Sequence, residues 1–179
     1  MKIGTVFWIT GLSGAGKSTL AKELQSNLEQ LKHDSIILDG DELREVFDKT
    51  LNIKKNYSRD TRIKLALQYS KLCNLLALQG FNVIIATISM FKEIYEYNRN
   101  SIGKYIEIFI DTPISVLKKR DKKNIYNKLS EITTSNVAGL DVNVDYPINS
   151  DLVIKYSKNN TNKLNIEKII KIWKNINDY

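Results

Sequence analysis

Residues 6–19 read Val6-Phe7-Trp8-Ile9-Thr10-Gly11-Leu12-Ser13-Gly14-Ala15-Gly16-Lys17-Ser18-Thr19, and this stretch decides the fold. The apolar run Val6–Ile9 predicts a buried strand, and the residues from Ser18 onward predict a helix. Between them lies Gly-x-x-x-x-Gly-Lys-Ser, the spacing of a phosphate-binding loop (P-loop). A glycine-rich turn could match this spacing by chance. The strand before it and the helix after it favour a loop that binds a nucleoside triphosphate.

Each part of the loop has a chemical role in binding ATP. Glycines let the backbone turn tightly and point consecutive N–H groups at an anion. Lys17 supplies a charge for the β- and γ-phosphates, the Ser18 hydroxyl can bind Mg²⁺, and the positive end of the helix favours phosphate. We therefore expect Mg²⁺ as the cofactor and Lys17 as a catalytic residue. The expected ATP contacts are Gly11, Ser13, Gly14, Ala15, Gly16, Lys17, Ser18 and Thr19.

Composition narrows the class of protein. The chain has 179 residues, 42% of them hydrophobic, which predicts a single domain (residues 1–179) with a sizeable core. One cysteine and one histidine exclude the usual zinc clusters, and Cys73 is expected to be a buried thiol. We see no signal sequence and no apolar run of membrane-spanning length, so we expect a cytoplasmic protein without a membrane partner.

The net charge of +7 fits either nucleic acid or phosphate-rich substrates. The lysines are scattered, and there is no arginine-rich arm and no known nucleic-acid module. This distribution favours small anionic substrates, so we expect no nucleic-acid partner.

Apolar runs and helical periodicity alternate along the rest of the chain. The predicted strands are Val6–Ile9, Ser35–Leu38, Phe81–Ala86, Tyr105–Ile110 and Leu152–Ile154. The predicted helices are Leu20–Leu31, Glu42–Phe47, Arg59–Leu78, Met90–Asn100, one beginning near Pro113, and Ile166–Ile176, with an irregular polar loop at Asp48–Ser58. This alternation predicts an α/β protein with the P-loop NTPase fold, in which helices cover both faces of a mostly parallel sheet.

Asp39 and Asp41 follow the strand Ser35–Leu38, at the edge where open α/β sheets bind ligands. One acid can hold a Mg²⁺-bound water while the other accepts the proton of the attacking hydroxyl. Asp-Gly pairs are also common in solvated turns, but the position after a strand of a P-loop protein favours catalysis. We count both as catalytic and place Asp39 with Ser18 at the metal, although the sequence leaves open which acid has which role. Arg44, one helical turn beyond Asp41, could bind an anionic acceptor.

Residues 118–136 are rich in charge and poor in apolar periodicity, beginning with Lys118-Lys119-Arg120-Asp121-Lys122-Lys123. Such a run could be a solvated surface. It could also be a mobile lid that closes over ATP, excludes water and adds positive charge near the transferred phosphoryl group. Its position after a strand-helix unit of a small kinase favours the lid, with Arg120 as an ATP contact.

Several segments, in order, resemble adenylylsulfate (APS) kinases. They are Gly11–Thr19, Leu38-Asp39-Gly40-Asp41-Glu42-Leu43-Arg44, Ile88-Ser89, Phe109-Ile110-Asp111-Thr112-Pro113, Arg120-Asp121 with Tyr126-Asn127-Lys128, and Gly139-Leu140-Asp141 before Leu152-Val153-Ile154. The resemblance implies a homodimeric P-loop kinase that uses Mg-ATP to phosphorylate the ribose 3′-hydroxyl of a nucleotide. It also implies that Asp41, Arg44, Arg62, Ile88, Ser89 and Lys128 lie in the acceptor site.

The sequence departs from the family pattern mainly at that acceptor site. Leu65 stands where the family has an asparagine that contacts the nucleotide, and Met90 stands where it has proline. The family stacks the acceptor's adenine between two phenylalanines; Val137 replaces one, and the other falls in the Asp48–Ser58 loop, at Tyr57 or Ile53. The Ser-Pro-Tyr-Glu run is replaced by Val142-Asn143-Val144-Asp145. We count Tyr57, Leu65 and Val137 as acceptor contacts.

These differences predict a kinase of this type with altered acceptor specificity, because stacking on an aromatic wall contributes about 1–3 kcal/mol per base. One fitting acceptor is cytidine diphosphoramidate, used in bacterial capsule phosphoramidate synthesis. A genuine adenylylsulfate kinase with a divergent pocket is the alternative. A non-catalytic nucleotide-binding switch and a nucleic-acid kinase are less well supported, since the acids, the lid and the acceptor arginines occur together.

Overall fold

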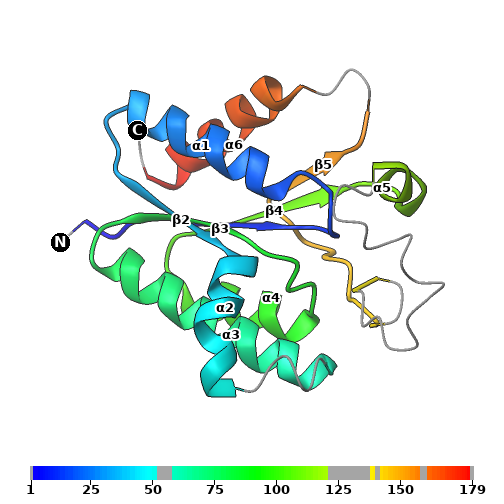
Figure 1. The fold of residues 1–179 in the computed structure, drawn as a ribbon. Helices are drawn as coiled ribbons and strands as arrows, with labels where there is room; N and C mark the ends of the chain where they lie inside the picture. Colours follow the sequence, from blue (N-terminus) through cyan, green and yellow to red (C-terminus); the bar gives the residue numbers. More distant parts are fainter. Residues whose placement is uncertain (1, 52–57, 121–137, 140–141, 158–160, 178–179) are drawn as a thin grey trace.

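The computed structural model describes residues 2–51, 58–120, 138–139, 142–157 and 161–177. The strands in this part of the chain are β1 (Val6–Thr10), β2 (Ser35–Asp39), β3 (Asn82–Ala86), β4 (Tyr105–Asp111) and β5 (Leu152–Lys155). The helices are α1 (Lys17–Gln30), α2 (Gly40–Leu51), α3 (Arg59–Leu78), α4 (Lys92–Ser101), α5 (Ile114–Arg120) and α6 (Asn162–Ile176). Figure 1 shows these elements as three layers, with the sheet in the middle.

The strands pair in parallel in the order β2-β3-β1-β4-β5. Helices α1 and α6 cover one face of the sheet, and α2, α3 and α4 cover the other (Figure 1). This arrangement confirms the predicted α/β fold. Because β1 lies between β3 and β4, the chain winds to one side of β1 first and to the other side afterwards. In open α/β sheets, ligands bind at the carboxyl ends of the strands beside such a reversal.

Strand β1 is buried on both faces, and Val6, Phe7, Trp8 and Ile9 are fully buried. Successive strand residues point to opposite faces. Phe7 and Ile9 therefore join the core under α1 and α6, whereas Val6 and Trp8 join the core under α3 and α4. Each of these side chains contributes about 1.5–3 kcal/mol through burial. The strand that carries the phosphate-binding loop is thus anchored from both sides.

Cys73 of α3 is buried in the second of these cores, as predicted. Burial raises the pKa of its thiol to about 12, so it stays protonated at neutral pH. Among the residues that the structure describes, no helix combines the length and the apolar character that a membrane crossing requires.

Several helix boundaries differ from the sequence prediction, among them those of α2, α4 and α6. The predicted loop at Asp48–Ser58 is wrong in its first part, because α2 continues to Leu51. Leu43 and Phe47 pack on the core one turn apart, and the acids of the first turn favour the helix start. Helix α4 begins at Lys92 rather than Met90. Helix α6 begins at Asn162, four residues before Ile166, because the Thr161 hydroxyl accepts the Leu164 N–H as an N-cap.

The predicted lid at 118–136 lies mostly outside the described residues. Its first residues, Lys118 to Arg120, form the last turn of α5. Cations favour the carboxyl end of a helix, where the backbone carbonyls carry partial negative charge. The closing motion of residues 121–136 stays a prediction.

A buried polar cluster links β4 to α4 and to the segment before β5. The Glu107 carboxylate, 2% exposed, accepts hydrogen bonds from the Ser150 hydroxyl (2.8 Å) and the Tyr105 hydroxyl (3.2 Å). Arg99 lies 3.7 Å from the same carboxylate and also pairs with Asp151, which accepts the Glu107 N–H. Burial raises the pKa of Glu107, and the contacts with Ser150 and Arg99 offset only part of that rise.

We expect Glu107 to weaken the fold as the pH rises. Its pKa is higher in the folded protein than in the unfolded chain, so its contribution to stability is complete below the ordinary value of 4.5 and is lost as the pH rises through the raised pKa. In Glu107→Gln, whose side chain does not titrate, this loss should disappear. Urea unfolding of both proteins at acidic and at neutral pH should show the free energy of unfolding shifting in favour of the variant at neutral pH.

The matched control is Glu96→Gln, which removes an exposed carboxylate from α4. The difference in the free energy of unfolding between Glu96→Gln and the natural protein should not shift in favour of the variant at neutral pH. A Glu107→Gln difference that is constant with pH, or that shifts against the variant at neutral pH, would contradict the assignment.

Candidate active site

The loop after β1 adopts a backbone that only glycine takes easily. Gly11, Gly14 and Gly16 have φ angles of 148°, 76° and 106°. A Cβ on Gly11 would also lie 2.7 Å from the Ile110 carbonyl oxygen of the neighbouring β4. Helix α1 begins directly after Gly16. The first N–H groups of a helix lack intrahelical partners and carry partial positive charge, so this loop presents an anion site.

The Lys17 side chain lies against the loop that it belongs to. Its ammonium donates hydrogen bonds to the carbonyl oxygens of Gly11 (2.8 Å) and Leu12 (2.9 Å). These bonds hold the positive charge at the loop, within reach of an anion bound by the loop backbone. The predicted position of Lys17 beside the phosphates fits this arrangement.

Asp39 and Asp41 have different partners, a distinction that the sequence left open. The Ser18 hydroxyl donates to Asp39 Oδ2 (2.7 Å), which joins the end of β2 to the first turn of α1. The other Asp39 oxygen accepts the Asp41 N–H (2.9 Å). Asp41 instead forms an ion pair with Arg44 (2.7 Å), and both side chains are exposed. Asp39 therefore belongs to the P-loop side, and Asp41 to the side where Arg44 lies.

The turn after β2 packs closely on the turn after β3. A Cβ on Gly40 would lie 2.9 Å from the Thr87 hydroxyl, so Asp39 and Asp41 need glycine between them. The Thr87 and Ser89 hydroxyls are 2.8 Å apart. Thr10, at the end of β1, donates to the Ile88 carbonyl. Sequence reasoning did not count Thr10 or Thr87 as site residues, although each stands at the carboxyl end of a predicted strand.

The predicted acceptor residues fall into three groups. Arg62 lies half-buried in the first turn of α3, and Ile88 and Ser89 lie at the end of β3, with Ser89 in a left-handed backbone (φ 22°). Leu65 is 6% exposed and packs in the core under α3, and its contact with the acceptor stays a prediction. It faces the core because it lies on the stripe of α3 that includes Tyr69. Tyr57, Lys128 and Val137 lie outside the described residues.

Arg120 ends α5 with its guanidinium over the Tyr156 ring, 5.0 Å from the ring centre. Tyr156 follows β5 and its N–H donates to the Asp111 carbonyl at the end of β4. The pair therefore lies at the carboxyl edge of the sheet. The ATP contact of Arg120 stays a prediction. Sequence reasoning did not name Tyr156, because no motif marks a residue whose position depends on the pairing of β4 with β5.

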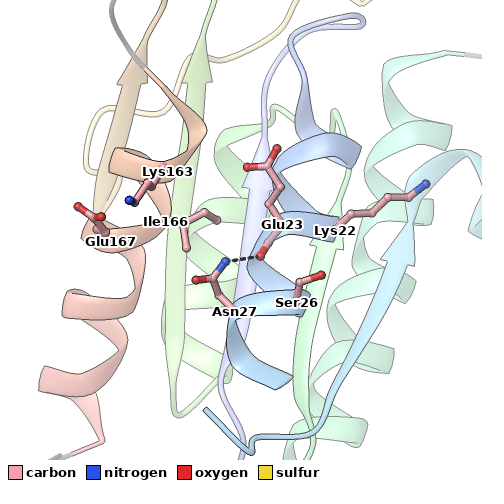
Figure 2. A pocket seen from close by; sticks show the side chains of 7 residues that line it. All are labelled: Lys22, Glu23, Ser26, Asn27, Lys163, Ile166 and Glu167. Atoms are coloured by element: carbon pink, nitrogen blue, oxygen red, sulfur yellow. Dashed lines mark hydrogen bonds between the residues drawn. The ribbon is translucent and has the colours of Figure 1, made fainter. Parts of the chain in front are cut away.

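A hollow of about 370 Å³ lies elsewhere, between α1 and α6. Its lining includes Lys22 and Glu23 of α1 and Lys163 and Glu167 of α6 (Figure 2). It contains none of the predicted site residues. The candidate active site is therefore the carboxyl edge of the sheet, around residues 11–18, 39–44 and 87–89.

The fold and this loop define a P-loop protein, and comparisons with known proteins specify the family. The family model for adenylylsulphate kinase matches residues 3–155. A cytidine diphosphoramidate kinase of Campylobacter jejuni is 41% identical over 93% of this chain and 94% of its own length. The adenylyl-sulfate kinase of Gloeothece citriformis is 34% identical over 83% of this chain and 82% of its own length.

A solved structure agrees. The Mycobacterium tuberculosis APS kinase CysC, in complex with AMPPNP and APS, matches with a TM-score of 0.85 and 29% identity over 97% of this chain and 99% of that one. The chain belongs to the adenylylsulphate kinase family. It is a phosphotransferase, and the predicted P-loop NTPase fold is confirmed.

We expect the backbone of the loop, more than its side-chain contacts, to limit nucleotide binding. A Cβ on Gly16 would meet nothing within 4 Å, so Gly16→Ala isolates the cost of the left-handed backbone. That cost is about 1–2 kcal/mol; a loop that avoids it by leaving this conformation when empty should bind Mg-ADP about tenfold more weakly in calorimetry. Gly103→Ala is the control, because Gly103 also has open space around it but no left-handed backbone. Equal affinities for both variants would contradict the expectation.

Proposed function

We propose that this enzyme transfers the γ-phosphoryl group of ATP to the ribose 3′-hydroxyl of cytidine diphosphoramidate. The observation that carries the proposal is the 41% identity, across almost the full length of both chains, to a protein named cytidine diphosphoramidate kinase. Adenylyl-sulfate kinases from Gloeothece citriformis and Pseudomonas aeruginosa are 34% and 36% identical over 83% of this chain. The sequence departures at residues 65 and 137 point the same way, since the family resemblance places both at the acceptor site.

The residues at the end of β2 and the start of α1 fit a Mg²⁺ ion. The Ser18 hydroxyl and Asp39 Oδ2 are 2.7 Å apart, so two hard oxygen donors converge there. Mg²⁺ in nucleotide sites takes one or two protein oxygens together with phosphate oxygens and water. When bound, the ion would neutralise part of the phosphate charge. Ser18 and Asp39 would hold it, and Lys17 would bind the β- and γ-phosphates.

We assign the proton transfer to Asp41. The acceptor oxygen attacks the γ-phosphorus, the bond from that phosphorus to the bridging oxygen of ADP breaks, and the hydroxyl proton passes to the Asp41 carboxylate. Arg44, paired with Asp41 on one exposed turn of α2, can bind an anionic group of the acceptor. Arg62 on α3 supplies a second cation for the same acceptor. Asp39 is the metal-side acid because its two oxygens already face Ser18 and the Asp41 N–H.

We propose that the acceptor site favours a pyrimidine because it lacks the contacts that would hold a purine. Leu65 is buried and apolar, so it offers no hydrogen bond to a base. Val137 offers no aromatic face for stacking. We further propose, on the family resemblance, that the enzyme is a homodimer and works in the cytoplasm, where ATP is available. Sedimentation analysis tests the assembly.

A panel of acceptors tests the substrate. We expect kcat/KM for cytidine diphosphoramidate to exceed that for adenylylsulfate by about tenfold or more, in line with the loss of one or two stacking contacts. A coupled assay of ADP release, with each nucleotide titrated at saturating Mg-ATP, measures the ratio. A preference of about tenfold for adenylylsulfate would mean that the enzyme is a genuine adenylylsulfate kinase.

The two aspartates should respond differently to metal. Asp39→Asn and Asp41→Asn both fit the turn and should fold. Loss of a general base lowers the rate by about 10²–10⁴-fold, and we expect this of Asp41→Asn at every Mg²⁺ concentration. In Asp39→Asn, higher Mg²⁺ should restore part of the rate, since the defect lies in holding the ion. Recovery of the Asp41 variant instead of the Asp39 variant would reverse the assignment.

A further inference from the structure

Asp145 joins three segments that are distant in sequence. Its carboxylate oxygen Oδ2 accepts hydrogen bonds from the Arg59 guanidinium of α3 (2.6 Å) and from the Lys92 N–H at the start of α4 (3.0 Å). Its backbone N–H donates to the Met90 carbonyl (2.9 Å), and its own carbonyl accepts the Tyr95 hydroxyl (3.1 Å). One residue of an irregular segment is thus bound through its side chain and through both backbone groups.

Arg59 makes several further contacts in this arrangement. Besides Asp145, its guanidinium binds both carboxylate oxygens of Glu93, at 2.8 and 3.1 Å. It also lies over the Phe91 ring, 5.2 Å from the ring centre. A planar guanidinium can make several directed bonds and stack on a ring at once, which a lysine ammonium cannot. We call this set of contacts the Asp145 junction; it comprises Arg59, Met90, Phe91, Lys92, Glu93, Tyr95 and Asp145.

Stability alone gives a weak reason for the junction. The side chains of Arg59, Glu93 and Asp145 are 36%, 50% and 42% exposed. An isolated exposed ion pair adds little to the free energy of unfolding and costs side-chain entropy; a bidentate network adds more, but these side chains remain partly in solvent. The sheet and its two cores do not include these three side chains. The junction fixes the positions of three segments relative to one another.

Two of those segments carry residues of the proposed acceptor site, and the third packs on the P-loop. Arg62 follows Arg59 by one helical turn, and Ser89 directly precedes Met90. The segment of Asp145 begins at residues 138–139, where Gly139 packs so tightly on Leu12 of the P-loop that a Cβ would lie 2.6 Å from the Leu12 side chain. The junction therefore connects the acceptor residues to one another, and through Gly139 to the loop that holds the phosphoryl donor.

We propose that Arg59 and Asp145 are positioning residues for the nucleotide acceptor, and this inference rests on the proposed kinase function. They hold the first turn of α3, the turn between β3 and α4, and the segment before β5 in one arrangement, so that Arg62 and Ser89 face the same acceptor. The junction uses Met90 and Asp145, which both belong to stretches that depart from the APS-kinase pattern. The junction therefore affects how the enzyme binds its acceptor.

Conservative variants separate positioning from folding. In Arg59→Lys and in Asp145→Asn, the KM for the acceptor should rise by about tenfold, while the KM for ATP and the melting temperature stay close to those of the natural enzyme. The double variant should lose less than the sum of the two single losses, because the two variants remove the same Arg59–Asp145 contact. The control is Glu96→Gln, which removes an exposed ion pair with Lys92 on the same helix and should change neither KM.

The acceptor in this test is whichever nucleotide of the panel the enzyme uses best, so a preference for adenylylsulfate would refute the proposed substrate without deciding the junction. Hydrogen exchange gives an answer that needs no acceptor: in Arg59→Lys, amides of residues 89–95 and 142–146 should exchange faster, and those of β1 should not. Acceptor KM values within about twofold of the natural enzyme, equal rises in both KM values, or unchanged exchange would each overturn the proposal.

Discussion

The burial of β1 on both faces is the constraint on which the rest of the structure depends. Four consecutive apolar side chains, fully buried, hold the strand between β3 and β4. The chain must then leave the core at Thr10, and the room beside β4 admits only a glycine at position 11. The turn that follows delivers Lys17 and Ser18 to the carboxyl edge of the sheet. A change in the register of β1 would move the loop away from Asp39 and separate Ser18 from its partner.

The elements that sequence reasoning predicted well depend on local chemistry. An apolar run and a glycine pattern are enough to predict β1, the loop and α1, because the strand is buried and the backbone needs glycine at defined positions. The resemblance to APS kinases predicted the family, which the family model and the relatives confirm. The true end of α2 was missed because Asp48, Lys49 and Thr50 interrupt the apolar pattern before Leu51 ends the helix.

What sequence reasoning could not predict depends on contacts between distant residues. Arg59 and Asp145 are 86 positions apart, and neither belongs to a motif. Helix α3 has apolar residues on most of its surface, so periodicity alone does not say which of them face the core. The partners of Asp39 and Asp41 also required the structure, since they depend on how α1 and α2 lie beside the end of β2.

The two halves of the site are therefore built in different ways. The donor side is made of one continuous loop whose backbone angles are fixed by glycines and by a buried strand, so few substitutions there are compatible with the fold. The acceptor side that we propose draws on α2, α3, the end of β3 and the segment before β5, which are joined by exposed polar contacts. Substitutions at such contacts cost little stability. A P-loop kinase of this design can therefore change its acceptor while it keeps its phosphoryl donor, because only the acceptor side can be rebuilt without disturbing β1.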